Sequence, residues 1–321
     1  MRLAGPLTVL YSLAMTLNAQ QGWYPHEGGQ LKYRVNIRFG QEPETMPAGW
    51  TFGRVSAVAT DAMERVYVAH RGTVADPIVV FDAKGKYLRS WGKGLFGSPH
   101  AMRVDREGNI WSTDTVTHQV LKFTPEGKLL MELGVKGQPG ADQKTFNRPT
   151  DVAFTPSGDF FVSDGYGNSR VVKFSSDGKY LLEWGRRGTG PGEFNLPHVM
   201  AVDSKGRLYV SDRENNRIQI FDFNGKFLRQ WTHLGATQGV FMTPKDELWI
   251  ITHRDNIENV TYDTLAGRIM RIDPETGQIL GSIQSPGHWL DVSAAGEIFV
   301  ASLTGNVFRF YPGWVERKPG R

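Results

Sequence analysis

The feature that most constrains the fold is an internal repeat. Six copies of one pattern follow each other at intervals of roughly 40 to 50 residues. The copies begin at Val55, Pro99, Pro149, Pro197, Thr237 and Gly287. A unit of this length cannot bury its apolar face alone, so neighbouring copies have to pack against one another. We therefore expect one architecture built from six similar units.

Each copy has the same internal order of short strands and turns. The copy at residues 99–116 reads PHAMRVDREGNIWSTDTV, in which a strand, a glycine-containing turn and a second strand follow each other. A third strand such as QVLKF ends on an aromatic residue, and an outer strand such as GKYLRSWG ends on Trp-Gly. Glycine and asparagine supply the positive φ angles that tight hairpins need. Four antiparallel strands repeated on this scale predict an all-β, six-bladed β-propeller.

The two ends of the chain are expected to meet in one blade. The sixth copy lacks an outer strand after Phe310, and the segment 31–39, LKYRVNIRF, precedes the first copy. An N-terminal strand that completes the last blade would close the ring and remove exposed edges. We therefore predict one domain over residues 30–314, although the length alone suggests two. Residues 315–321 are expected to form a disordered tail.

Composition excludes several classes of function. The formal net charge is +4 and the pI is about 9.2, without a run of five or more basic residues, so a nucleic-acid partner is not expected. The chain has no cysteine, which excludes disulfides, thiol catalysis and cysteine-ligated zinc. Any bound metal would need histidine and oxygen ligands.

The N-terminus resembles a secretory signal peptide over residues 1–20. Arg2 precedes an apolar stretch from Leu7 to Leu17, and the small residue Ala19 follows. The stretch is too short for a transmembrane helix. This pattern predicts a secreted or periplasmic protein without a membrane span after signal removal; the alternative is a buried or disordered N-terminal arm.

Three histidines recur at one position of the repeat. The residue five places before the Asp, Thr or Ser that ends each first strand is, in order, Ser56, His100, Thr150, His198, Gln238 and His288. In a six-bladed ring the second, fourth and sixth blades lie about 120° apart. The three imidazoles would therefore converge at one mouth of the central channel.

Three neutral imidazoles with an open fourth position suit a catalytic zinc ion. Iron, cobalt and nickel also accept imidazole ligands. The alternative is that the histidines only form hydrogen bonds in the channel wall. Their equivalent positions on alternate blades favour a metal site formed by His100, His198 and His288.

Other polar residues follow the second strand of several copies. Arg71, Tyr166 and Arg213 occupy these loops and should surround the metal. A phenol can donate or accept a proton, and a guanidinium suits a carboxylate. Asp114, Asp164 and Asp212 recur before the loops, and Arg170 and Arg217 recur inside the next strand. These recurring pairs are interpreted as structural.

The remaining histidines near these loops receive separate interpretations. His118 is aligned with Arg170 and Arg217 and is interpreted as structural. His253 and Arg254 lie in a loop with an insertion, and a role at the substrate entrance remains an alternative for them.

Several stretches resemble a known family. The blade pattern is similar to NHL-repeat propellers, and SDGYGNSR, FNLPHVMAVD and SDRENNRIQIF resemble peptidyl-α-hydroxyglycine α-amidating lyases. The likeness is dense from Leu95 to Phe221. It implies a zinc site of His100, His198 and His288, with Tyr166 as catalytic base and Arg71 and Arg213 in the active site. The implied reaction cleaves an N-acyl- or peptidyl-α-hydroxyglycine to an amide and glyoxylate.

This sequence departs from the family at several positions. Asn147, Gly167, Tyr209 and Ile220 stand where animal members have disulfide cysteines. The resemblance also implies a structural calcium, bound partly by an Asp after the last zinc histidine. Trp289 occupies that position, which argues against calcium, although backbone oxygens near Met102 remain available.

Two other functions remain as alternatives. A metal-dependent propeller hydrolase of the lactonase type generally needs carboxylate ligands, whereas the predicted channel positions offer His, Ser, Thr and Gln. A non-catalytic NHL-repeat binding protein would bind no metal and would use a broad face for a protein partner. The natural substrate, the native metal and the oligomeric state are left open by the residues.

Overall fold

The computed structural model describes residues 23–28, 31–41, 45–252, 267–285 and 287–312. The predicted signal peptide, the predicted tail, and His253 and Arg254 lie outside these residues. In the part that is described, no helix is long and apolar enough to cross a membrane. The described chain is all-β apart from one short 3₁₀ turn, η1 (Arg213–Asn215).

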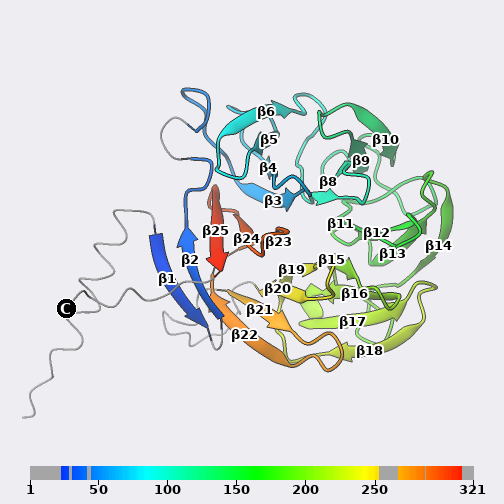
Figure 1. Ribbon diagram of the computed structural model, residues 1–321. Helices are drawn as coiled ribbons and strands as arrows, with labels where there is room; N and C mark the ends of the chain where they lie inside the picture. Colours follow the sequence, from blue (N-terminus) through cyan, green and yellow to red (C-terminus); the bar gives the residue numbers. More distant parts are fainter. Residues whose placement is uncertain (1–22, 29–30, 42–44, 253–266, 286, 313–321) are drawn as a thin grey trace, which may run out of the picture.

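Six antiparallel sheets are arranged in a ring, which confirms the predicted β-propeller (Figure 1). Blade 1 contains β3 (Val55–Thr60), β4 (Val66–His70), β5 (Ile78–Phe81) and β6 (Tyr87–Trp91). Blade 2 contains β7 (Arg103–Val104), β8 (Ile110–Asp114), β9 (Gln119–Phe123) and β10 (Leu129–Leu133). Blade 3 contains β11 (Asp151–Phe154), β12 (Phe160–Asp164), β13 (Arg170–Phe174) and β14 (Tyr180–Trp184). Blade 4 contains β15 (Pro197–Val202), β16 (Arg207–Asp212), β17 (Arg217–Asp222) and β18 (Phe227–Trp231). Blade 5 contains β19 (Thr237–Met242), β20 (Leu248–Thr252), β21 (Arg268–Ile272) and β22 (Ile279–Gln284).

Blade 6 joins the two ends of the described chain. It contains β23 (Trp289–Val292), β24 (Ile298–Ser302), β25 (Asn306–Pro312), β2 (Leu31–Asn36) and β1 (Trp23–Gly28). The pairing of Tyr33 with Pro312 and of Val35 with Phe310 confirms closure by an N-terminal strand. The fifth strand, β1, was not predicted, and it begins before the predicted domain boundary at residue 30.

The residue that ends each first strand organises the turn that follows it. In blade 2, Asp105 Oδ1 accepts hydrogen bonds from the backbone N–H groups of Glu107 and Asn109, at 3.0 and 2.8 Å. Gly108 in the same turn has a φ of 83°, which a side chain would disfavour. Asp203 and Thr243 accept equivalent bonds in blades 4 and 5. The recurring Asp and the Thr of blade 5 are therefore explained by their turns. Thr155 instead donates to the carbonyl of Asp159, and Ser293 Oγ has no hydrogen-bond partner among the described residues.

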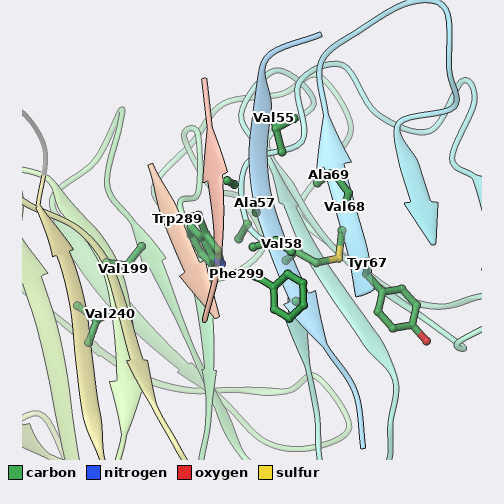
Figure 2. Close-up of a cluster of buried hydrophobic side chains, with 14 of the residues drawn as sticks. Val55, Ala57, Val58, Tyr67, Val68, Ala69, Val199, Val240, Trp289 and Phe299 are labelled. Carbon is green, nitrogen blue, oxygen red and sulfur yellow. The ribbon is translucent and has the colours of Figure 1, made fainter. Parts of the chain in front are cut away.

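Apolar side chains fill the space between neighbouring blades. In Figure 2 the side chains of Val58, Tyr67, Trp289 and Phe299, from blades 1 and 6, lie in one cluster. Each of these side chains is at most 1% exposed. Because the innermost strands are buried on both faces, they hold the channel-lining residues rigidly.

The recurring Asp–Arg pairs lie inside single blades. Asp164 accepts from Arg170 at 3.0 Å, and Asp212 accepts from Arg217 at 2.7 Å. In blade 2, however, Asp114 faces Gln119 rather than the predicted His118. The alignment of His118 with the two arginines was therefore wrong by one residue.

Candidate metal centre

The three predicted histidines converge at one end of the central channel. Their closest ring nitrogens all lie within 4.8 Å of one another, and the three side chains are buried. His100 Nε2 and His198 Nε2 are 3.2 Å apart. The ring centroid of His288 lies 4.9 Å from that of His100 and 5.2 Å from that of His198.

The backbone of the following blade orients each imidazole. The Nδ1 atoms of the three histidines lie 2.7 to 2.8 Å from carbonyl oxygens of the next blade: Thr150 for His100, Gln238 for His198 and Ser56 for His288. These acceptors are the three channel positions at which the repeat has no histidine. Because a carbonyl only accepts, Nδ1 carries the proton and Nε2 presents its lone pair.

Burial keeps the imidazoles of His100 and His198 neutral. Desolvation, together with His288 and Arg71, lowers the pKa of His100 well below its usual range. Desolvation, together with Arg213 and His100, lowers the pKa of His198 in the same way. Neutral imidazole is the form that binds metal ions.

The donor set fits a divalent transition metal. Two lone pairs that face each other at 3.2 Å repel unless a cation lies between them. Zinc–nitrogen distances of 2.0 to 2.1 Å with tetrahedral angles place two ligand nitrogens about 3.3 Å apart. Among the described residues, the group of His, Asp and Glu side chains that could hold a metal consists of these three histidines and contains no carboxylate.

The surroundings of Trp289 do not fit the calcium ion that the resemblance implied. Trp289 offers an indole ring, and the guanidinium of Arg103 lies 4.5 Å from the centre of that ring. Arg103 also donates to both carboxylate oxygens of Asp151 and to the backbone oxygens of Met200 and Val240. A buried guanidinium that already uses these oxygens would repel a second cation.

Tyr166 lies against two of the three histidines. Its hydroxyl oxygen is 3.0 Å from His100 Nε2 and 3.1 Å from His198 Nε2. Tyr166 belongs to the loop after β12, where Gly165 packs so closely that an added Cβ would lie 2.0 Å from the carbonyl oxygen of Pro197. The backbone N–H of Tyr166 donates to the carbonyl of Arg148 at 3.3 Å. This close packing fixes the position of the phenol.

Both predicted arginines border the phenol. Arg213 NH1 lies 3.4 Å from the hydroxyl of Tyr166, and Arg213 also pairs with Glu214 at 2.8 Å. Arg71 donates from Nε to the carbonyl of Pro99 at 3.2 Å. Burial lowers the pKa of Arg71, while the nearby Tyr166 opposes that shift. The structure therefore brings the six predicted residues to one place.

Two arginines at this mouth were missed. The guanidinium of Arg148 lies 5.3 Å from the ring centre of Tyr166, compared with 5.5 Å for Arg213. The charge of Arg54 acts on Arg71, and the carbonyl of Arg54 accepts the backbone N–H of Arg71 at 2.9 Å. Arg148 precedes the proline that opens the third copy, so alignment of the residues before these prolines would have drawn attention to it.

Comparisons with known proteins agree with this architecture. A family model described as a 6-bladed beta-propeller matches residues 140–284. A peptidyl-glycine alpha-amidating monooxygenase of Mus musculus is 43% identical over 195 residues, which cover 51% of this chain and 20% of the mouse protein. Peptidyl-alpha-hydroxyglycine alpha-amidating lyase 1 of Drosophila melanogaster is 39% identical over 160 residues, which cover 46% of this chain and 29% of the fly protein. The resemblance to amidating lyases is confirmed.

The NHL-like character of the repeats is also supported. NHL repeat-containing protein 3 of Homo sapiens is 34% identical over 198 residues, which cover 58% of this chain and 55% of the human protein. A gluconolactonase structure from Xanthomonas campestris superposes with a TM-score of 0.65 at 14% identity, covering 90% of this chain and 95% of that one. This identity supports the shared fold alone. The chain spans about a fifth of the length of the mouse relative.

Proposed function

We propose that this protein is a zinc-dependent carbon–nitrogen lyase that cleaves an N-acyl- or peptidyl-α-hydroxyglycine to an amide and glyoxylate. The observation that carries the proposal is the convergence of three imidazole lone pairs with the hydroxyl of Tyr166. Lyase names among the relatives support the reaction class. A zinc ion at the three histidines would supply a Lewis acid that lowers the pKa of a nearby hydroxyl.

The proposed role of Tyr166 is that of the base. The substrate has a hydroxyl group and an amide nitrogen on the same carbon. Tyr166, as the phenolate, takes the hydroxyl proton, the oxygen forms the C=O bond of glyoxylate, and the C–N bond breaks with its electrons going to nitrogen. The tyrosine then returns the proton to that nitrogen. No water is consumed, so the reaction is an elimination and not a hydrolysis.

The two predicted arginines have complementary roles in this proposal. Arg71 has no ion-pair partner among the residues that the structure describes, and its guanidinium can bind the substrate carboxylate. Arg213 lies 3.4 Å from the phenol oxygen and stabilises negative charge there when the tyrosine acts as a base. We propose that a secreted or periplasmic enzyme meets this substrate outside the cytoplasm.

The test is release of glyoxylate from N-benzoyl-α-hydroxyglycine by zinc-loaded protein. We expect release that stops in a chelator-treated sample and returns when zinc is added. Protein that binds one equivalent of zinc but releases no glyoxylate from this substrate or from a peptidyl-α-hydroxyglycine would contradict the proposal. Hydrolysis of a lactone by the same sample would instead favour the hydrolase alternative.

A further inference from the structure

The mouth of the channel carries more positive charge than a substrate with one carboxylate requires. Arg54, Arg71, Arg148 and Arg213 border it, and a single guanidinium is sufficient to bind a carboxylate through two parallel hydrogen bonds. Of these four arginines, Arg213 pairs with Glu214. The other three form no ion pair within the described ranges. Two exposed arginines, Arg54 and Arg148, therefore remain without a role.

The backbone of Arg148 is held in an unusual conformation. Its φ is 63°, in the left-handed region that residues other than glycine and asparagine seldom adopt. His118 Nδ1 accepts its N–H at 3.0 Å, and its carbonyl accepts the N–H of Tyr166. Leu196, at the equivalent position of the fourth copy, has a φ of 76°, so this conformation belongs to the repeat. In the third copy these contacts fix the point from which the Arg148 side chain starts beside Tyr166.

The backbones of Arg54 and Arg71 are locked together. Gly53 and Gly72 lie so close that a Cβ on either would meet the backbone of the other at 2.5 Å. His70 Nδ1 accepts the N–H groups of both glycines, at 3.3 and 2.9 Å. The side chains of Arg54 and Arg71 therefore extend from neighbouring, fixed backbone positions at the same mouth. This is expected for a preorganised binding surface.

We propose that Arg148 and Arg54 form a second anion subsite that recognises a carboxylate on the acyl group of the substrate. The preferred substrate class is then an N-acyl-α-hydroxyglycine with two carboxylates, one on the reacting carbon and one on the acyl chain. This inference rests on the proposed lyase function. A metal dication and four guanidinium groups around one opening would also attract such a dianion from a distance.

The test compares N-succinyl-α-hydroxyglycine with its distal methyl ester, which differ in one negative charge. We expect the wild-type enzyme to release glyoxylate from the diacid with a kcat/KM about tenfold higher, since a charge-assisted pair contributes on this scale. Arg148→Gln should remove most of that preference, so that kcat/KM falls by up to about tenfold more for the diacid than for the ester. Arg148→Lys should retain part of it.

The control variant is Arg106→Gln. Arg106 is an exposed arginine in the turn after β7, beside the cavity of about 450 Å³ at the opposite mouth, so its loss changes the net charge equally. Arg106→Gln should leave the preference for the diacid over the ester unchanged. Equal kcat/KM for the two substrates in the wild type would overturn the inference. The inference would also be overturned if Arg148→Gln lowered kcat/KM equally for both substrates, because that result would assign Arg148 to positioning Tyr166.

A binding measurement separates this inference from the proposed reaction. N-succinylglycine and its distal methyl ester lack the reacting hydroxyl and can be titrated calorimetrically into the zinc-loaded protein. If the wild type binds the diacid more tightly than the ester, and Arg148→Gln abolishes this difference, the result would support the subsite even if no glyoxylate is ever released. Equal binding of the two ligands, with glyoxylate release intact, would reject the subsite and keep the lyase.

Discussion

At the scale of single residues, the three histidines use their two ring nitrogens for different purposes. Nδ1 donates to a carbonyl of the next blade, and Nε2 is left to face the channel axis. This division depends on burial, since water would otherwise compete for both nitrogens. It explains why the blades without a histidine still contribute to the site: their carbonyl groups set the orientation of the rings.

Tyr166→Phe and His198→Ala should separate catalysis from metal binding. Tyr166→Phe keeps all three imidazoles, so we expect about one equivalent of zinc and a fall in kcat of roughly 100- to 10,000-fold. His198→Ala should lose both zinc and activity. Zinc content by mass spectrometry and glyoxylate release check both variants. A fully active Tyr166→Phe enzyme would show that another group is the base.

Asp291 should make stability depend on pH. Burial raises the pKa of Asp291 to about 6. Hydrogen bonds from Thr60, at 2.5 and 2.7 Å, and the charge of Arg103 lower this pKa but do not outweigh burial. Because the folded pKa is above the unfolded one, the folded state binds more protons between pH 4 and 6. The stabilisation from protonated Asp291 is therefore complete below about pH 4 and is lost as the pH rises through 6.

Asp291→Asn removes this titration while keeping an oxygen that accepts from Thr60. Relative to the wild type, its free energy of unfolding should rise by up to about 3 kcal/mol between pH 4 and pH 7. Urea unfolding at several pH values measures the difference. A difference that stays constant across this range would show that Asp291 keeps its charge in the folded protein.

At the scale of elements, the loops that carry Tyr166 and Arg213 are each tied to the segment that enters the same blade. Asp164 Oδ1 accepts the backbone N–H of Asn147 at 2.9 Å, and Asp212 Oδ1 accepts that of Asn195 at 2.6 Å. The same two aspartates pair with arginines in the third strand of each blade. Buried carboxylates thus hold the loops of Tyr166 and Arg213 against the segments that lead into the first strands of blades 3 and 4.

Gly165→Ala should disturb the loop of Tyr166. The new Cβ would lie 2.0 Å from the carbonyl oxygen of Pro197, which neighbours His198, so the backbone has to shift. We expect a loss of about 1 to 3 kcal/mol in the free energy of unfolding and a reduced kcat. In the matched control Gly190→Ala, the new Cβ meets only the flexible side chain of Glu193, at 3.1 Å. Similar kinetics for both variants would argue against precise positioning by Gly165.

At the scale of the whole molecule, one guanidinium connects five blades. Arg103 of blade 2 contacts Asp151 of blade 3, the carbonyl groups of Met200 and Val240 of blades 4 and 5, and the ring of Trp289 of blade 6. Asp291 of the same blade as Trp289 binds Thr60 of blade 1. Polar contacts along the channel therefore complete the ring that closes at the outer edge of blade 6.

Arg103→Met should destabilise the propeller strongly. The substitution leaves Asp151 buried without its partner, and loss of one member of a buried pair costs about 3 to 5 kcal/mol. The double variant Arg103→Met/Asp151→Asn should recover part of this loss, because no charge then remains buried. Urea unfolding of the wild type, the single variants Arg103→Met and Asp151→Asn, and the double variant forms a complete cycle. An Arg103→Met protein as stable as the wild type would contradict the role of this clamp.

The sequence alone determined the blade pattern, the six-bladed ring, its closure by an N-terminal strand and the three histidines on alternate blades. Each of these follows from local periodicity and from equivalent positions in a repeat, which can be compared by alignment. His118 shows the limit of this approach, because a shift of one residue in the alignment assigned it to the place of Gln119.

Only the tertiary structure decided which side chains meet across the channel. Arg103 stands on a two-residue strand, and Arg54 and Arg148 each directly precede the first residue of a copy. The partners of Arg103 belong to other blades and to positions that are not equivalent in the repeat, so no periodicity connects them with Arg103. The direction of a side chain at the axis depends on how all six blades close around it, and closure is a property of the complete ring.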